Sequence, residues 1–206
     1  LEIFDADGSA AWYLEFAELA EGEQVSHESR FNYADPNWRA TFGWNYFRED
    51  SIQNVPFSSE EGTFLQCAAR VVPGIPCIDA AGVVQAAQVT GLLTGGALTQ
   101  VPYSSVFENG GINASYSVFA DATWIASDSI ELTAGARVLI EDRESTFFAR
   151  VPRPRLNPTA FSLIPGQVDT GGQTFRTKRS YAAVLPRANI LFRLDERSNI
   201  FATVSK

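Results

Sequence analysis

Several residue types are scarce in this sequence of 206 residues, and each shortage narrows the functional class. Methionine is absent, histidine occurs only as His27, and the only lysines are Lys178 and Lys206, so arginine supplies most of the positive charge. Acidic residues outnumber basic ones by 24 to 16, which leaves a net charge of −8. Because a nucleic-acid partner requires a basic face, we expect none.

Long apolar runs are missing as well. No stretch of 18 or more apolar residues occurs, so the sequence has no candidate transmembrane helix. The residues that follow Leu1 show no signal-peptide pattern, and the sequence starts abruptly without an initiator methionine. We therefore expect residues 1–206 to be an internal piece of a longer protein. The hydrophobic share of 45% still predicts a folded chain.

Two cysteines, Cys67 and Cys77, lie ten residues apart in a segment rich in proline and glycine. Such a pair predicts a disulfide in an oxidising compartment, with two free thiols as the alternative. Together with His27 they are too few for a tetrahedral metal site. No nucleophile or acid–base set can be defined either, so we expect no catalytic residues, no metal and no cofactor.

Aromatic residues are plentiful, and they recur with the two-residue period of a β-strand. Trp38, Phe42 and Tyr46 share one face of such a segment, while Arg39 belongs to the other. These strands are about 10 to 14 residues long, enough for a tilted crossing of a bilayer, which takes roughly 9 to 11. The alternation predicts strands over residues 24–33, 38–49, 115–125, 130–142, 181–194 and 199–206, with 1–4 as the end of a seventh.

The connections between these strands alternate between short and long. Turn-forming residues predict short connections at 34–37, 126–129 and 195–198, and the long ones are 5–23, 51–113 and 145–179. In an antiparallel meander, alternate connections lie at the same end. All short turns should therefore lie on one rim and all long loops on the other, an asymmetry that is typical of outer-membrane β-barrels.

The two faces of the predicted strands differ in chemistry. Aromatic residues near the strand ends, Trp38, Tyr46 and Trp124, are candidates for the girdles that mark the two membrane interfaces. The core of a β-sandwich is the alternative, because it also collects aromatic residues. The opposite faces are too polar for a core, and their candidate lumen-facing residues are Arg39, Asp121, Arg137, Glu141 and Arg187.

Two features of the long loops stand out. Arg150, Arg153 and Arg155 form a cluster that could bind a carboxylate or phosphate through their guanidinium groups, although an ordinary solvated loop would look the same. Residues 83–98 could form a short helix, which together with Cys67 and Cys77 would make an ordered cap.

Three strand pairs carry a family resemblance: Tyr116–Trp124 with Ile130–Arg137, Leu185–Phe192 with Asn199–Lys206, and His27–Phe31 with Trp38–Phe47. In order and spacing they resemble the barrel strands of TonB-dependent receptors. Asp121 departs from that pattern, because glutamine is common at its place.

The resemblance implies that residues 1–206 are part of an antiparallel, up-and-down transmembrane β-barrel of the bacterial outer membrane, with about six or seven strands. No plug domain is visible in the sequence, which is a departure from the family pattern. It implies uptake of a scarce ligand of the iron–siderophore, cobalamin or oligosaccharide class, driven by TonB. The long extracellular loops would receive the ligand, the wall would contact lipid and lipopolysaccharide, and TonB would act only through the missing plug. A passive porin and a secreted β-sandwich that binds glycans stay open as alternatives.

Overall fold

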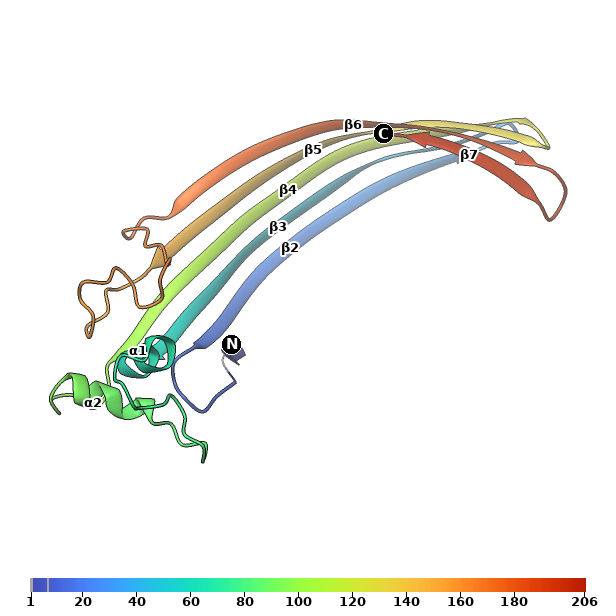
Figure 1. The fold of residues 1–206 in the computed structure, drawn as a ribbon. Coiled ribbons are helices and arrows are strands. Elements are labelled where there is room, and N and C mark those ends of the chain that lie inside the picture. The colour runs from blue at the N-terminus through green and yellow to red at the C-terminus, as the bar shows by residue number, and fades with distance from the viewer. Residues whose placement is uncertain (1, 7) are drawn as a thin grey trace. The chain divides into compact units, whose positions relative to one another are not determined.

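The computed structural model describes residues 2–6 and 8–206, and in this part of the chain seven strands form one sheet (Figure 1). Each strand pairs with its neighbours in the chain, in the order β1-β2-β3-β4-β5-β6-β7. The strands are β1 (Glu2–Asp5), β2 (Glu15–Ala34), β3 (Trp38–Glu60), β4 (Pro102–Ser127), β5 (Ile130–Arg150), β6 (Phe175–Arg193) and β7 (Asn199–Ser205). This confirms the predicted all-β, antiparallel sheet of about seven strands. The sheet is not closed, because β1 and β7 lie at its two edges.

The two edge strands are short and pair antiparallel with their neighbours. In the first pair Glu2 lies opposite Glu18, and in the last pair Arg187 lies opposite Ser205. The strand expected over residues 1–4 is therefore present as β1, while Leu1 itself lies outside the described residues.

The five inner strands are 19 to 26 residues long, so the predicted lengths of 10 to 14 are wrong. The predicted loop over 51–113 is shorter than expected, because β3 continues to Glu60 and β4 begins at Pro102. Pro56 and the Gly110-Gly111 pair lie inside these extensions. Both are ordinarily read as strand breakers, which explains the error.

The chain divides into two compact units. Unit 1 comprises residues 1–21, 51–110 and 146–176, and unit 2 comprises residues 22–50, 111–145 and 177–206. The tight connections 35–37, 128–129 and 194–198 all belong to unit 2, and the long ones, 6–14, 61–101 and 151–174, all belong to unit 1. The predicted alternation of short and long connections is therefore confirmed. At the first turn, Asp35 Oδ1 accepts the backbone N–H groups of Asn37 and Trp38, both at 2.8 Å.

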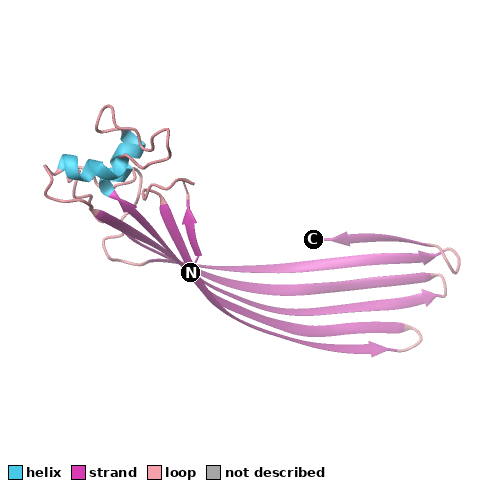
Figure 2. Cartoon of the chain, turned by 90° about the horizontal axis from the view of Figure 1, so that it is seen from below, coloured by secondary structure: helices cyan, strands magenta, loops and turns pink. Residues whose placement is uncertain are grey.

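The helices of the chain lie in the long connections of unit 1 (Figure 2), and a small hydrophobic core joins these connections to the strands of the same unit. Phe57, Phe64, Tyr103 and Leu163 pack together, and they come from β3, α1 (Glu61–Ala69), β4 and the 151–174 connection. The helix expected within residues 83–98 is present as the short helices η1 (Ala86–Gln88) and α2 (Val89–Leu93). In the described part of the chain, none of the helices is long and apolar enough to cross a membrane.

Candidate functional site: two faces of the sheet and a folded cap

The first candidate feature is an exposed apolar face of the sheet in unit 2. Stacked or tilted ring pairs join neighbouring strands on this face, with Trp38 6.3 Å from Trp124 and Tyr46 5.1 Å from Tyr116, measured between ring centroids. The side chains between the two pairs are also open to solvent, and Ile140 is 48% exposed. Its members, called the apolar face below, include Phe31, Trp38, Phe42, Trp44, Tyr46, Tyr116, Val118, Trp124, Val138 and Ile140.

The aromatic pairs bracket the apolar face at both ends. Trp38 and Tyr46 are eight residues apart on β3, as are Tyr116 and Trp124 on β4, which corresponds to roughly 26 Å along a strand at about 3.3 Å per residue. Beyond the tyrosine pair, charged side chains take over the positions that alternate onto this same face. Arg48 lies 3.7 Å from Asp50, and Lys178 lies 2.7 Å from Glu144. The apolar face is therefore a band with a defined height.

The other face of unit 2, called the polar face below, holds the residues predicted to line a lumen. A groove of about 620 Å³ on this face is lined by Arg39, Asp121, Arg137 and Arg187, so the structure brings four of these five residues together. The fifth, Glu141, is not among the lining residues. It pairs with Arg143 two positions along β5, at 2.5 Å.

Ion pairs across the strands organise the polar face. Arg187 Nε donates to Asp121 Oδ1 at 2.5 Å, and the carboxylate of Glu131 accepts hydrogen bonds from both Arg39 and Arg193. Glu131 is only 6% exposed, which fits a carboxylate that is neutralised from two sides. It was not among the predicted site residues. Its place in strict alternation with Arg137 on β5 was the signal that could have identified it.

Two glycines on the polar face leave room for side chains of neighbouring strands. A Cβ atom at Gly43 would come within 2.7 Å of the Phe119 ring, and one at Gly135 would come within 1.8 Å of Asp121 Oδ1. Arg30 lies over the same Phe119 ring, with its guanidinium carbon 5.7 Å from the ring centroid. A larger residue at Gly43 or Gly135 would therefore collide with the Phe119 ring or with the Asp121 carboxylate of the groove.

In unit 1, a buried carboxylate anchors the long 61–101 connection. Glu60 Oε2 accepts the N–H and the hydroxyl of Thr63, at 2.6 and 2.7 Å, and Oε1 accepts the hydroxyl of Thr90 at 2.5 Å and the N–H of Val101 at 3.0 Å. Burial alone would raise the pKa of Glu60. The four hydrogen bonds outweigh that effect and hold the pKa below its ordinary value. A single side chain thereby joins the start of α1, the start of α2 and the residue before β4.

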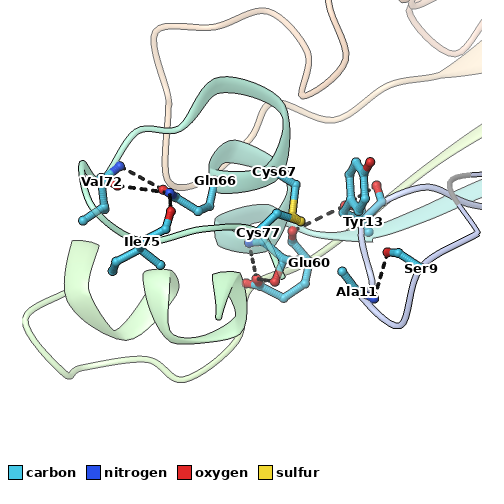
Figure 3. The surroundings of a disulfide bond; sticks show 11 residues. Ser9, Ala11, Tyr13, Glu60, Gln66, Cys67, Val72, Ile75 and Cys77 are labelled. Atoms are coloured by element: carbon cyan, nitrogen blue, oxygen red, sulfur yellow. Dashed lines mark hydrogen bonds between the residues drawn. A yellow bond between two sulfur atoms is a disulfide. The ribbon is translucent and has the colours of Figure 1, made fainter. Parts of the chain in front are cut away.

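The candidate pair Cys67 and Cys77 is joined by a disulfide that closes a small loop (Figure 3). The side-chain amide of Gln66 clamps the same loop from inside. It accepts the Val72 N–H at 2.8 Å and donates to the carbonyl oxygens of Val72 at 3.0 Å and Ile75 at 2.5 Å. The loop is thus held by one covalent bond and three hydrogen bonds.

The candidate anion-binding residues Arg150, Arg153 and Arg155 all have exposed side chains in unit 1. The segment that carries these arginines is held by its backbone and not by their side chains. The N–H groups of Arg155 and Leu156 donate to the two carboxylate oxygens of the buried Glu61, at 2.8 and 2.7 Å. Within the described residues, no group of three or more histidine, cysteine, aspartate or glutamate side chains could hold a metal ion.

Comparison with protein-family models finds no family that matches the chain, and no curated protein matches it.

Proposed function

We propose that this chain is part of the wall and loops of an outer-membrane β-barrel, in a receptor of the TonB-dependent type that takes up a scarce ligand. The single observation that carries the proposal is the apolar face of unit 2, with its aromatic pairs at both ends. An apolar face of this extent on a water-soluble protein would be covered, because exposed patches beyond a few hundred Å² are uncommon.

The dimensions of the band fit a bilayer. For strands tilted by about 40°, the 26 Å between the tryptophan and tyrosine pairs projects to roughly 20 Å along the membrane normal. Aromatic side chains at both ends add a few Å each, which approaches the roughly 25 Å apolar band of outer-membrane barrels. The charged pairs Arg48–Asp50 and Lys178–Glu144 then lie outside the hydrocarbon.

The polar face supports the same proposal from the other side. Each strand of a barrel wall places one residue toward lipid and the next toward water, and here the ring pairs alternate with the ion pairs of Arg39, Glu131 and Arg187. A β-sandwich would need a second sheet over the apolar face, whereas the described residues form one sheet. Uptake of an iron–siderophore, cobalamin or oligosaccharide with TonB-coupled energy follows from the resemblance of the strand pairs, and it distinguishes this proposal from a passive porin.

The four tryptophans allow a direct test of the bilayer position. Trp38, Trp44 and Trp124 belong to the apolar face, and Trp12 belongs to unit 1, where its indole N–H donates to Ser58. Four variants of the full chain, each retaining one tryptophan and carrying phenylalanine at the other three, would be inserted into vesicles whose lipids carry bromine at known depths.

We expect Trp44 to be quenched best by deep bromine atoms and Trp38 and Trp124 by shallow ones. On the strand geometry above, Trp44 lies about 5 Å nearer the bilayer centre than Trp38. Trp12 is the matched control and should be quenched by aqueous iodide instead. Equal access of iodide to all four tryptophans would refute the proposal.

A further inference from the structure

The groove on the polar face carries more positive charge than its own carboxylates neutralise. Four guanidinium groups line it, those of Arg30, Arg39, Arg137 and Arg187, together with the ammonium group of Lys206. Only two side-chain carboxylates, those of Glu28 and Asp121, line it with them. Arg30 pairs with Glu28 at 2.7 Å, Arg187 pairs with Asp121 at 2.5 Å, and Arg39 and Arg193 share Glu131, which leaves Arg137.

Among the guanidinium groups of this groove, Arg137 is the one for which the described residues supply no carboxylate partner. Its guanidinium donates to the hydroxyl of Ser117 at 2.8 Å, and in the described part of the chain no carboxylate oxygen lies within 4.0 Å of it. The side chain is exposed and lines the groove. A guanidinium in this state retains donors for an oxyanion.

The neighbouring groups are donors too. Thr123 and Thr133, which line the same groove, share one hydrogen bond of 2.8 Å between their hydroxyl groups. Whichever hydroxyl accepts that bond keeps its own hydrogen, which can be donated into the groove. The carboxylates, in contrast, are already occupied by guanidinium groups, so the groove offers few acceptors to a cation or to a sugar hydroxyl.

We infer that this groove, of about 620 Å³, binds a small polyanion with phosphate or carboxylate oxygens, and that Arg137 is its primary contact. The inference rests on the proposed function, because the polar face meets solutes when it lines the water-filled side of the wall. It assigns anion binding to the groove of unit 2 and not to the arginine cluster Arg150, Arg153 and Arg155. A chain with a net charge of −8 therefore places a local excess of positive charge on one face.

The test uses the full chain in detergent micelles with inorganic pyrophosphate as the probe. Calorimetry would measure pyrophosphate affinity for the wild type, Arg137→Gln, Arg137→Lys and Arg153→Gln. Arg137→Gln and Arg153→Gln remove the same single charge, so the second is the matched control. We expect Arg137→Gln to weaken binding by about tenfold or more, Arg137→Lys to weaken it less, and Arg153→Gln to leave it within about twofold.

A second measurement needs no variant. Phenylglyoxal modification of the wild type, read by mass spectrometry, should be slowed by pyrophosphate at Arg137 and not at Arg153. Failure of the wild type to bind pyrophosphate, protection at Arg153 alone, or equal affinity of Arg137→Gln and wild type would each overturn the inference. Tryptophan quenching in vesicles is independent of pyrophosphate, so it separates failure of this inference from failure of the proposed function.

Discussion

Glu60 provides the sharpest test of how the long 61–101 connection is held. Each of its carboxylate oxygens accepts one hydroxyl and one backbone N–H, from Thr63 at Oε2 and from Thr90 and Val101 at Oε1. In Glu60→Gln, either orientation of the amide places its NH₂ group against a backbone N–H, which cannot rotate to become an acceptor. A lost hydrogen bond to a charged group and a buried donor without a partner together cost about 2 to 4 kcal/mol.

This cost can be measured by hydrogen exchange on the full chain in detergent. Amides of α1 and α2 should exchange roughly 30- to 1,000-fold faster in Glu60→Gln than in wild type, since 1.36 kcal/mol corresponds to a factor of ten. Glu21→Gln is the control, because Glu21 is exposed and belongs to the same unit. Exchange in Glu60→Gln within threefold of wild type would show that the carboxylate does not hold this connection.

Three further outcomes follow from the same contacts. The pKa of Glu60 is lowered in the folded state, so the stabilisation by its carboxylate is present above the ordinary glutamate pKa and is lost as the pH falls through the lowered value. The protection of the α1 amides from hydrogen exchange, corrected for the intrinsic exchange rate, should therefore drop in acid in the wild type and stay constant in Glu60→Gln. Replacing Cys67 and Cys77 by serine removes a closed loop worth about 2 to 3 kcal/mol, and limited proteolysis should then cut between the two positions; an uncut loop would mean that the clamp of Gln66 suffices. In Gly135→Ala the added methyl group collides with the Asp121 carboxylate, so the affinity for pyrophosphate measured by calorimetry should change. An unchanged affinity would contradict the steric role given to Gly135.

The sheet of unit 2 could be predicted from the sequence because residues close together in the chain determine its strands and turns. Alternation of Trp38, Arg39 and their successors fixes the two faces, and the aspartate turn at Asp35 fixes the first hairpin. Short turns then fix the pairing of the strands on either side. For that reason, four of the five residues predicted to share the inner face do line one groove.

Unit 1 was much less predictable, because its contacts join positions far apart in the chain. Glu60 meets Val101 across 41 residues, and Glu61 meets Leu156 across 95. No periodicity marks such contacts. Pro56 also made the end of β3 hard to predict. A proline has no N–H to donate to a neighbouring strand and is ordinarily confined to edge strands and bulges.

The buried acidic residues of the two units, Glu60 and Glu61 in one and Glu131 in the other, are stabilised by different partners. This explains why the sequence did not identify any of the three as a site residue. Glu60 and Glu61 are satisfied by backbone N–H groups and threonine hydroxyls, so no arginine near them in sequence indicates their burial. Glu131 is satisfied by Arg39 and Arg193, which lie 92 and 62 residues away and reach it only because β3, β5 and β6 belong to one antiparallel meander. Arg137, six residues along β5 from Glu131, donates instead to the hydroxyl of Ser117, so the positive excess of the groove depends on which strands lie side by side and not on the composition of the chain.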